Sequence, residues 1–240
     1  KSASIIRRCI NENPKAKIIV TGCLVKKDSQ VLAKIEGVSF IVEKSFFAEG
    51  ISDFSSHTRA FLKIQDGCDN FCAYCKVPLV RGRSRSRPLK EVVKEAKDLA
   101  RNGFKEIVLT GICLGAYGRD LKPKISLVKV IDALEEIDCI LRIRLSSIEA
   151  GDVTDALIKR IAKSKKLCRH LHIPLQSGDD KILKKMNRRY TFKSYLSLIR
   201  RIKARIPELS ITTDIMVGFP SETEGNFQNT IRLIEEIIPL

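Results

Sequence analysis

Residues 61–75 read FLKIQDGCDNFCAYC, a strand-like segment that runs directly into three cysteines. Cys68, Cys72 and Cys75 have the spacing C-x3-C-x2-C, so the three thiols lie within eight residues and can converge on one face of a loop. Soft thiolates select an iron–sulfur cluster, zinc or Cu(I). Three thiolates leave one iron of a [4Fe–4S] cube without a protein ligand and open to a small molecule. The spacing therefore predicts a metal centre with one open position.

A zinc site built on the same thiols is the alternative interpretation. Its fourth ligand would come from elsewhere, with Cys113, Cys168 or His170 as candidates. Zinc knuckles usually lie in small, loop-rich modules, whereas this triplet follows the first strand of a long series of strands and helices. The context favours the iron–sulfur cluster and leaves zinc open.

Strands and amphipathic helices alternate from Arg59 onward. Strands are predicted over residues 60–64, 106–110, 140–145, 170–173 and 209–217. Helices are predicted over residues 89–100, 127–137, after Asp152, over 192–206, and from a Ser221/Glu224 capping box to 238. This rhythm is typical of parallel βα units, and both an open doubly wound sheet and a partial barrel fit it. In either fold, ligands gather at the carboxyl ends of the strands.

Residues 1–52 read as a separate, short α/β segment. A strand is predicted over residues 16–22 with Cys23 at its end, followed by a helix capped by Asp28 and a second strand over residues 38–42. The polar, serine-rich residues 53–58 are the predicted linker, and residues 59–240 are the predicted main domain.

The composition indicates a globular protein with an aliphatic core, since 44% of the residues are hydrophobic and none is Trp. No apolar run approaches the roughly 20 residues that span a membrane, and no signal peptide is visible. We therefore expect no membrane partner, a cytoplasmic location and reduced thiols. The sequence begins without Met and ends just after a helix, so we expect a fragment lacking both ends.

Basic residues dominate the charge. Lys and Arg number 44 against 28 acidic residues, which gives a net charge of +16. Such an excess attracts polyanions through Coulomb steering and counterion release. Nucleic acid is the predicted partner, with a basic but inert surface as the alternative.

An ordered set of motifs resembles the radical S-adenosylmethionine methylthiotransferases, most closely the subgroup that acts on threonylcarbamoyladenosine in tRNA. Besides residues 61–75, the motifs are KIIVTGCLVKK (17–27), VRGRSRSRP (80–88), IVLTGICLGAYG (107–118), LRIRLSS (141–147), LHIPLQSG (171–178) and DIMVGFPSETEGNF (214–227). The resemblance covers essentially the whole chain. It implies a partial (βα) radical-SAM barrel, cut before its last strand and preceded by the C-terminal part of a small α/β N-terminal domain.

The resemblance also implies an activity, which is transfer of a methylthio group to carbon 2 of a modified adenosine beside the tRNA anticodon. The predicted base is threonylcarbamoyladenosine, with isopentenyladenosine or a ribosomal-protein aspartate as alternatives. A non-catalytic zinc- or RNA-binding module is the alternative of a different class. The implied cofactors are S-adenosylmethionine and two [4Fe–4S] clusters in the full-length protein, one of them within this sequence. The implied partners are tRNA and an electron donor, with no prediction of oligomeric state.

By the same resemblance, Cys68, Cys72 and Cys75 match the ligands of the radical cluster. Cys23 matches the third of three ligands of the auxiliary cluster, whose first two cysteines would lie upstream of Lys1. Four residues at strand ends are assigned to cofactor binding: Gly111, Gln176, Ser177 and Gly218. The plainer alternative for Gly111 is an ordinary turn glycine. For Gly218 it is the end of a strand that Pro220 terminates.

Two further patterns have a structural and a functional interpretation. Arginines at every second position from 81 to 87 would line one side of an extended loop and bind phosphate or a substrate carboxylate, or they form a solvated surface. His170 and His172 share one face of their strand, which by resemblance looks into the barrel, although His170 reads equally well as a core histidine. Among the remaining cysteines, Cys113 lies nearest the predicted site.

Overall fold

A computed structural model describes residues 2–42 and 58–237, and these fall into two compact units. The first unit holds residues 2–42 together with 76–82, and the second holds residues 58–75 and 83–237. Residues 53–57 of the predicted linker lie outside the described residues. The domain boundaries at residues 52 and 58 therefore stay predictions.

The first unit contains two parallel strands, β1 (Ile18–Thr21) and β2 (Val38–Val42). Its helices are α1 (Ser2–Glu12), α2 (Cys23–Ala33) and the short α3 (Val77–Arg81). Parallel strands need a crossover connection, and α2 provides it. Its buried side chains are Val20, Val25, Leu32 and Ile35.

Two predictions in this unit are wrong in detail. Cys23 does not end a strand but begins α2, because Gly22 turns the chain with φ at 104° immediately after β1. Asp28 was predicted to cap the helix and instead lies inside it, at a kink where its φ is −134° and its ψ is 36°. The prediction found the second half of α2 and missed the first half.

The second unit is built on parallel strands that follow one another in chain order. Strands β3 (Ala60–Asp66), β5 (Glu106–Gly111) and β6 (Arg142–Leu145) are neighbours in one sheet, whose outer edge carries the antiparallel β4 (Arg85–Ser86). Strands β7 (His170–His172) and β8 (Ser210–Thr212) form a second parallel pair.

The two sheets are joined by sparse contacts between β6 and β7. A parallel bridge pairs Ile143 with Leu167, and the amide of Ile148 donates to the carbonyl of His172 at 2.9 Å. A doubly wound sheet reverses its strand order at a switch point, and no reversal occurs along β3, β5, β6, β7 and β8. The partial barrel is therefore the fold, and the doubly wound alternative is wrong.

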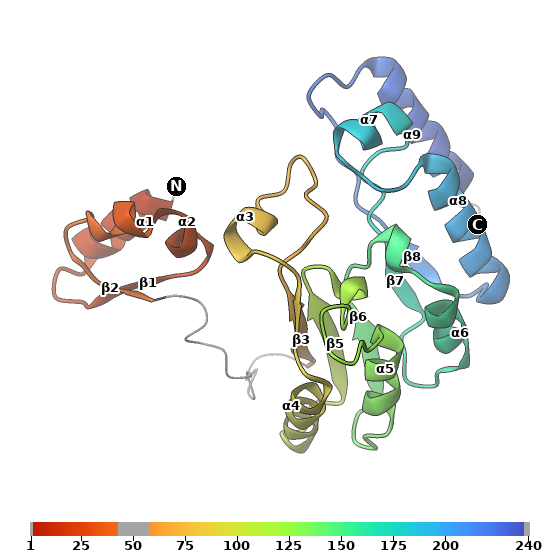
Figure 1. Ribbon diagram of the computed structural model, residues 1–240, viewed down its shortest axis with the longest axis horizontal. Coiled ribbons are helices and arrows are strands. Elements are labelled where there is room, and N and C mark those ends of the chain that lie inside the picture. The colour runs from red at the N-terminus through yellow and green to blue at the C-terminus, as the bar shows by residue number, and fades with distance from the viewer. Residues whose placement is uncertain (1, 43–57, 238–240) are drawn as a thin grey trace. The chain divides into compact units, whose positions relative to one another are not determined.

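Helices cover the outside of this arc in the same order (Figure 1). They are α4 (Leu89–Arg101), α5 (Leu127–Glu135), α6 (Asp155–Lys163), α8 (Phe192–Arg205) and α9 (Glu224–Ile237), while the short α7 (Asp180–Lys185) lies in the connection from β7 to α8. Contacts run from α4 to α5, α5 to α6, α6 to α8 and α8 to α9. None of the described helices is both long enough and apolar enough to cross a membrane.

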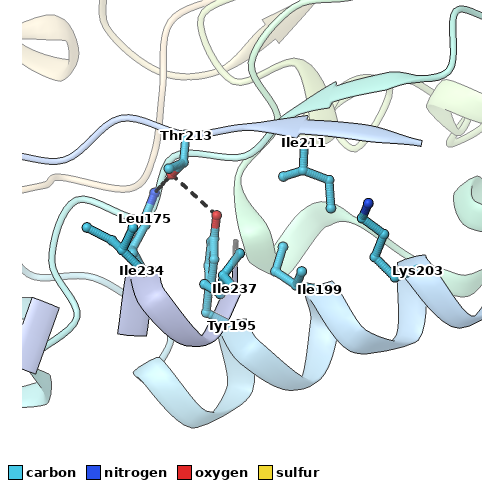
Figure 2. A pocket seen from close by; sticks show the side chains of 8 residues that line it. All are labelled: Leu175, Tyr195, Ile199, Lys203, Ile211, Thr213, Ile234 and Ile237. Atoms are coloured by element: carbon cyan, nitrogen blue, oxygen red, sulfur yellow. Dashed lines mark hydrogen bonds between the residues drawn. The ribbon is translucent and has the colours of Figure 1, made fainter. Parts of the chain in front are cut away.

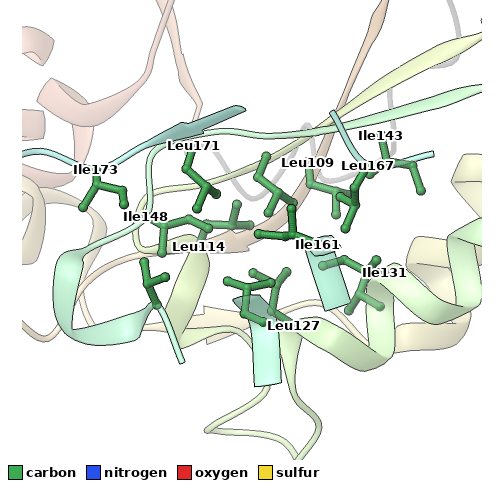
Figure 3. Close-up of a cluster of buried hydrophobic side chains, with 14 of the residues drawn as sticks. Leu109, Leu114, Leu127, Ile131, Ile143, Ile148, Ile161, Leu167, Leu171 and Ile173 are labelled. Carbon is green, nitrogen blue, oxygen red and sulfur yellow. The ribbon is translucent and has the colours of Figure 1, made fainter. Parts of the chain in front are cut away.

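The core lies between the strands and these helices. Figure 3 shows its centre, where Leu109, Ile143 and Leu171 from three strands meet Ile131 and Ile161 from α5 and α6. Side chains alternate along a strand, so the residues between these apolar positions face the inner side of the arc. On that inner face stand the apolar Phe61 and Val108 together with polar and charged side chains: Lys63, Gln65, Glu106, Thr110, Arg142, Arg144, His170, His172, Ser210 and Thr212.

The start of α9 also differs from the prediction. The capping pair is not Ser221 and Glu224 but Thr223 and Asn226, because the Oδ1 of Asn226 accepts from the amide of Thr223 at 3.0 Å and the Oγ1 of Thr223 accepts from the amide of Asn226 at 3.3 Å. Ser221 lies in a turn with φ at +68°, and its hydroxyl contacts Lys185 instead. The short helix α7 was not predicted.

Candidate functional site

The three clustered cysteines lie on the loop that leaves the carboxyl end of β3. Cys68, Cys72 and Cys75 are each half-buried and free of disulfides. Among the described residues, no three Cys, His, Asp or Glu side chains stand close enough together to hold a metal ion. The fold thus gathers the three thiols on one short loop but does not bring their sulfurs together. A thiol has three staggered positions about its Cα–Cβ bond, so the donor set fits a soft-metal centre by chemistry and by placement on the loop.

Gln65 anchors the start of this loop. Its side chain is 1% exposed, and its Nε2 donates to the carbonyl of Gly67 at 2.8 Å and to the hydroxyl of Ser84 at 2.9 Å. Its Oε1 accepts from the amide of Cys113 at 2.8 Å. One buried amide therefore joins the cysteine loop, the arginine-rich segment and the loop after β5.

Cys113 lies beside the first cysteine of the triplet. Asn70 links the two, because its amide donates to the sulfur of Cys68 at 3.4 Å and its Nδ2 contacts the sulfur of Cys113 at 3.7 Å. The hydrogen bond with Cys113 lowers the pKa of Cys68 to about 6. The same bond, together with burial and the Asp152 carboxylate, raises the pKa of Cys113. Cys68 is thus the member of the pair that favours the thiolate, the form that binds metal.

A distant segment, residues 186–190, packs across the cysteine loop. The amide of Ala73 donates to the carbonyl of Met186 at 3.0 Å, and the Nδ2 of Asn187 donates to the carbonyl of Phe71 at 2.9 Å. Arg189 adds a bond from its Nη2 to a second loop carbonyl, that of Asp69, at 2.9 Å. These contacts join parts of the chain more than 110 residues apart.

Arg188, in the middle of this segment, reaches a cysteine sulfur. Its Nη1 lies 3.3 Å from the sulfur of Cys72 and 3.3 Å from the hydroxyl of Tyr74. Its Nη2 pairs with the carboxylate of Glu149 at 2.5 Å, and its Nε donates to the hydroxyl of Tyr190 at 3.0 Å. Burial raises the pKa of Tyr74 to about 12, so that hydroxyl stays protonated near neutral pH. Sequence reasoning missed this cluster, since nothing in the sequence places residue 188 against residue 72.

A second polar group lies on the inner face, at the ends of three strands. The Nδ1 of His172 lies 2.6 Å from the hydroxyl of Ser147, and its Nε2 lies 3.4 Å from the carboxylate of Asp214. On the same strand, the Nε2 of His170 lies 2.9 Å from the hydroxyl of Thr212, while its Nδ1 is buried without a partner. His170 therefore offers an unpaired hydrogen-bonding atom and is not a satisfied core histidine.

Near the amino ends of β5 and β6, the inner face carries an excess of positive charge. Arg142 and Arg144 both donate to the carboxylate of Glu106, at 2.9 Å and 3.0 Å, and Arg59 lies 3.9 Å from it. Burial raises the pKa of Glu106, but the hydrogen bonds and charges of the two nearer arginines outweigh it and lower the pKa. Three cations thus surround one anion.

The residues assigned to cofactor binding have different surroundings. Gly111 leaves room for Gln65, because a Cβ at this position would lie 3.0 Å from the Oε1 of Gln65. Gln176 has an uncommon φ of +69°, and its backbone bonds to Asp214 and Met216 on the other side of the strand end. A non-glycine residue is uncommon at positive φ, so the surrounding backbone contacts hold Gln176 in this conformation.

The other two assigned residues are engaged within the fold. Ser177 is fully buried, and its hydroxyl accepts from the amide of Asp179 at 3.2 Å. Gly218 has a φ of +75°, and its amide donates to the carboxylate of Glu222 at 2.5 Å. The roles of all four residues toward a cofactor stay predictions.

The arginine-rich segment does not form one continuous row. Arg87 is drawn into the fold, since its Nη1 lies 2.5 Å from Glu95 and 2.9 Å from the carbonyl of Lys63. Arg83 pairs with Asp69 of the cysteine loop at 2.7 Å. Arg83 thus contacts the cysteine loop, whereas Arg87 joins β3 to α4, and neither lines an open anion clamp.

An apolar cavity of about 280 Å³ lies on the helix side of the second unit, between α8, α9 and β8 (Figure 2). Tyr195 points into it and donates to the Oγ1 of Thr213, which in turn accepts from the amide of Leu175 at 2.8 Å. None of the cysteines or predicted cofactor residues lines this cavity. It belongs to the packing of helices on strands, not to the candidate site.

Comparisons with known proteins agree with this architecture. Residues 62–234 match the sequence profile of the Radical SAM superfamily. A tRNA-2-methylthio-N(6)-dimethylallyladenosine synthase of Clostridium tetani is 46% identical over 209 residues, which cover 85% of this chain and 46% of that protein. The threonylcarbamoyladenosine tRNA methylthiotransferase MtaB of Bacillus subtilis is 39% identical, over 98% of this chain and 59% of that protein. The chain thus spans about half the length of the curated relatives it matches.

Solved structures support the fold alone. The radical S-adenosylmethionine methyltransferase TsrM from Kitasatospora setae aligns over 75% of this chain and 34% of its own, with a TM-score of 0.60 at 16% identity. Methylornithine synthase aligns over 75% of this chain and 50% of its own, with a TM-score of 0.52 at 16% identity.

Proposed function

Since the chain belongs to the Radical SAM superfamily, we propose that it forms the central part of a tRNA methylthiotransferase. The observation that carries the proposal is the C-x3-C-x2-C loop at the carboxyl end of the first strand of a parallel half-barrel. Ligands of such folds gather at this end of the strands. The relatives named methylthiotransferases supply the reaction class.

In this proposal, Cys68, Cys72 and Cys75 hold a [4Fe–4S] cluster. When bound, the cluster supplies the electron for reductive cleavage of S-adenosylmethionine at the iron that lacks a protein ligand. The chain's own part is to hold the loop in place through Gln65 and residues 186–190, and to offer hydrogen bonds from the inner face.

The polar inner face supports threonylcarbamoyladenosine over dimethylallyladenosine as the substrate base. A threonylcarbamoyl group carries a carboxylate, a hydroxyl and a urea, whereas a dimethylallyl group carries only apolar carbons. Nearer the carboxyl ends of the strands, the inner face offers the unpaired Nδ1 of His170 and the unpaired hydroxyl of Ser146. An apolar substituent would leave such groups unpaired, which a hydrogen-bonding site discriminates against strongly.

Cys23 belongs in this proposal to a second cluster, which in the full-length protein supplies the sulfur. It lies in the first unit, separate from the triplet. The remaining partners follow from the reaction: tRNA, attracted by the +16 charge, and a one-electron donor. The location proposed with this substrate is the cytoplasm.

The test uses the full-length enzyme in anaerobic assays with two tRNAs, one bearing threonylcarbamoyladenosine and one bearing dimethylallyladenosine. Mass spectrometry quantifies 5′-deoxyadenosine and the methylthiolated nucleoside. We expect methylthiolation of the first tRNA, no product with Cys72→Ala, and 5′-deoxyadenosine without methylthiolation with Cys23→Ala. Stoichiometric zinc, with S-adenosylmethionine left intact, would instead establish the non-catalytic zinc module.

A further inference from the structure

Arg188 is a buried cation placed against one of the three cysteine sulfurs. Its side chain is 5% exposed, although an arginine head group normally stays in water. Burying a charge is costly unless it is paired and hydrogen-bonded. Glu149 provides the pairing at 2.5 Å, and the hydroxyls of Tyr190 and Tyr74 provide neutral partners.

The remaining contact is with sulfur. The Nη1 of Arg188 lies 3.3 Å from the sulfur of Cys72, and the ring of Tyr190 lies 4.9 Å below the guanidinium carbon. The stacked ring and the ion pair fix the plane of the guanidinium, so its Nη1 is held beside the cysteine loop and within reach of the Cys72 sulfur. The carbonyls of Asp69 and Phe71 and the amide of Ala73, held by the same segment, fix the loop on the other side of the contact.

We propose that Arg188 is a positioning residue that raises the reduction potential of the cluster through its hydrogen bond to the sulfur of Cys72. The inference rests on the proposed ligand set of Cys68, Cys72 and Cys75. Hydrogen bonds to the ligand sulfurs, net charge and solvent exposure set the potentials of iron–sulfur clusters. A donor and a positive charge stabilise the reduced form more, because that form carries one more negative charge.

Arginine is suited to this position in a way that lysine is not. Its planar fork donates to Glu149, Tyr190 and Cys72 at once, whereas an ammonium group has no fixed plane and is more strongly hydrated. Arg188→Lys therefore keeps the charge and loses part of the directed contact. It should give an intermediate potential.

The simplest deletion changes two things at once, because removal of Arg188 leaves the Glu149 carboxylate buried and unpaired. Burial already raises the pKa of Glu149, although the Arg188 charge and hydrogen bond oppose it. The double variant Arg188→Met/Glu149→Gln removes both charges and isolates the contact with sulfur. Arg200→Met/Glu236→Gln is the matched control, since it removes an arginine–glutamate pair that links α8 to α9 and does not contact a cysteine sulfur.

The experiment is a redox titration of the full-length protein with dithionite, followed by electron paramagnetic resonance without S-adenosylmethionine. At a fixed potential, the double variant should show about a tenfold lower ratio of reduced to oxidised cluster, which is about 59 mV for a one-electron couple. Arg200→Met/Glu236→Gln should stay within about twofold of the wild type. An unchanged ratio in the double variant, with the affinity for S-adenosylmethionine weakened instead, would overturn the inference and make Arg188 a cofactor-binding residue.

Failure of the inference is distinguishable from failure of the proposed function. A wild-type protein that takes up no iron overturns the proposed function, whereas a loaded cluster with unchanged potential in the variants overturns only the role of Arg188. If the double variant folds but takes up no cluster, the reduction potential of Arg188→Lys tests the inference in its place. A potential equal to that of the wild type would contradict the directed contact with sulfur.

Discussion

The amide of Cys113 donates a 2.8 Å hydrogen bond to the Oε1 of Gln65, a side chain with 1% of its surface exposed. Through this contact, the loop after β5 is tied to the root of the cysteine loop. Gly111 lacks the Cβ that would press on the side chain of Gln65. The register between β3 and β5 places Gln65 opposite Gly111, so the contact is built into the sheet.

Gln65→Leu should lower the free energy of unfolding by about 3 kcal/mol, because it leaves the amide of Cys113 and the carbonyl of Gly67 buried without partners. Urea denaturation followed by circular dichroism measures the change. Gln228→Leu, at an exposed position of α9, is the control and should change stability by less than about 0.5 kcal/mol. Equal losses in the two variants would show that Gln65 is not an anchor.

Gly103 and Gly118 both have positive φ but differ in the room around them. Together they separate the cost of a left-handed backbone from the cost of a steric clash. At Gly118 φ is +78°, and an added Cβ would lie 1.8 Å from the carbonyl oxygen of Ile125, whereas at Gly103 φ is +92° and the space is open. Gly103→Ala should cost about 1 kcal/mol from the left-handed backbone alone. Gly118→Ala should cost at least about 3 kcal/mol, since backbone must move as well. Thermal unfolding of both variants measures the difference, and equal costs would contradict the close approach.

The Asp179 carboxylate makes the free energy of unfolding depend on pH in the acidic range. Burial alone would raise its pKa, but hydrogen bonds from the side chains of Asn229 and Asn226 and from the amides of Ile182 and Lys181 outweigh it and lower the pKa below the usual 3.8. A depressed folded pKa stabilises the fold above the unfolded value, and this contribution disappears as the pH falls through the folded pKa.

The matched variant is Asp179→Asn, which keeps a good N-cap for α7 and removes the titration. The wild type should be more stable at pH 7, and its advantage should shrink steadily as the pH falls below about 4. Denaturation midpoints of both proteins across this pH range test the sign. An advantage that grew on acidification would contradict it.

Much of the second unit could be predicted from the sequence because the apolar periodicity of its strands and helices is regular. The helix at residues 192–205 and the strand at 106–111 lie where the pattern indicated. The short α7, with three lysines in six residues, was missed because it has too few turns for periodicity to register. Ser221 satisfied the sequence pattern of a cap, but its positive φ leaves the capping to Thr223.

Only the part of the site formed by residues close together in the sequence could be predicted. The cysteine spacing is local and therefore visible in the sequence, whereas the partners of the loop come from residues 186–190, more than 110 positions away. Arg188 is one arginine among many until the fold places its guanidinium on Cys72. No local pattern encodes such a contact.

Iron and acid-labile sulfide analysis of the protein after anaerobic reconstitution tests the proposed cluster most directly. The second unit carries Cys68, Cys72 and Cys75 on its own loop, so the wild-type chain should bind about four iron and four sulfide per molecule. Replacement of all three by Ala should remove that iron, while Cys113→Ala should retain it. Full iron in the triple variant, or stoichiometric zinc in the wild type, would contradict the assignment of a radical cluster to this loop.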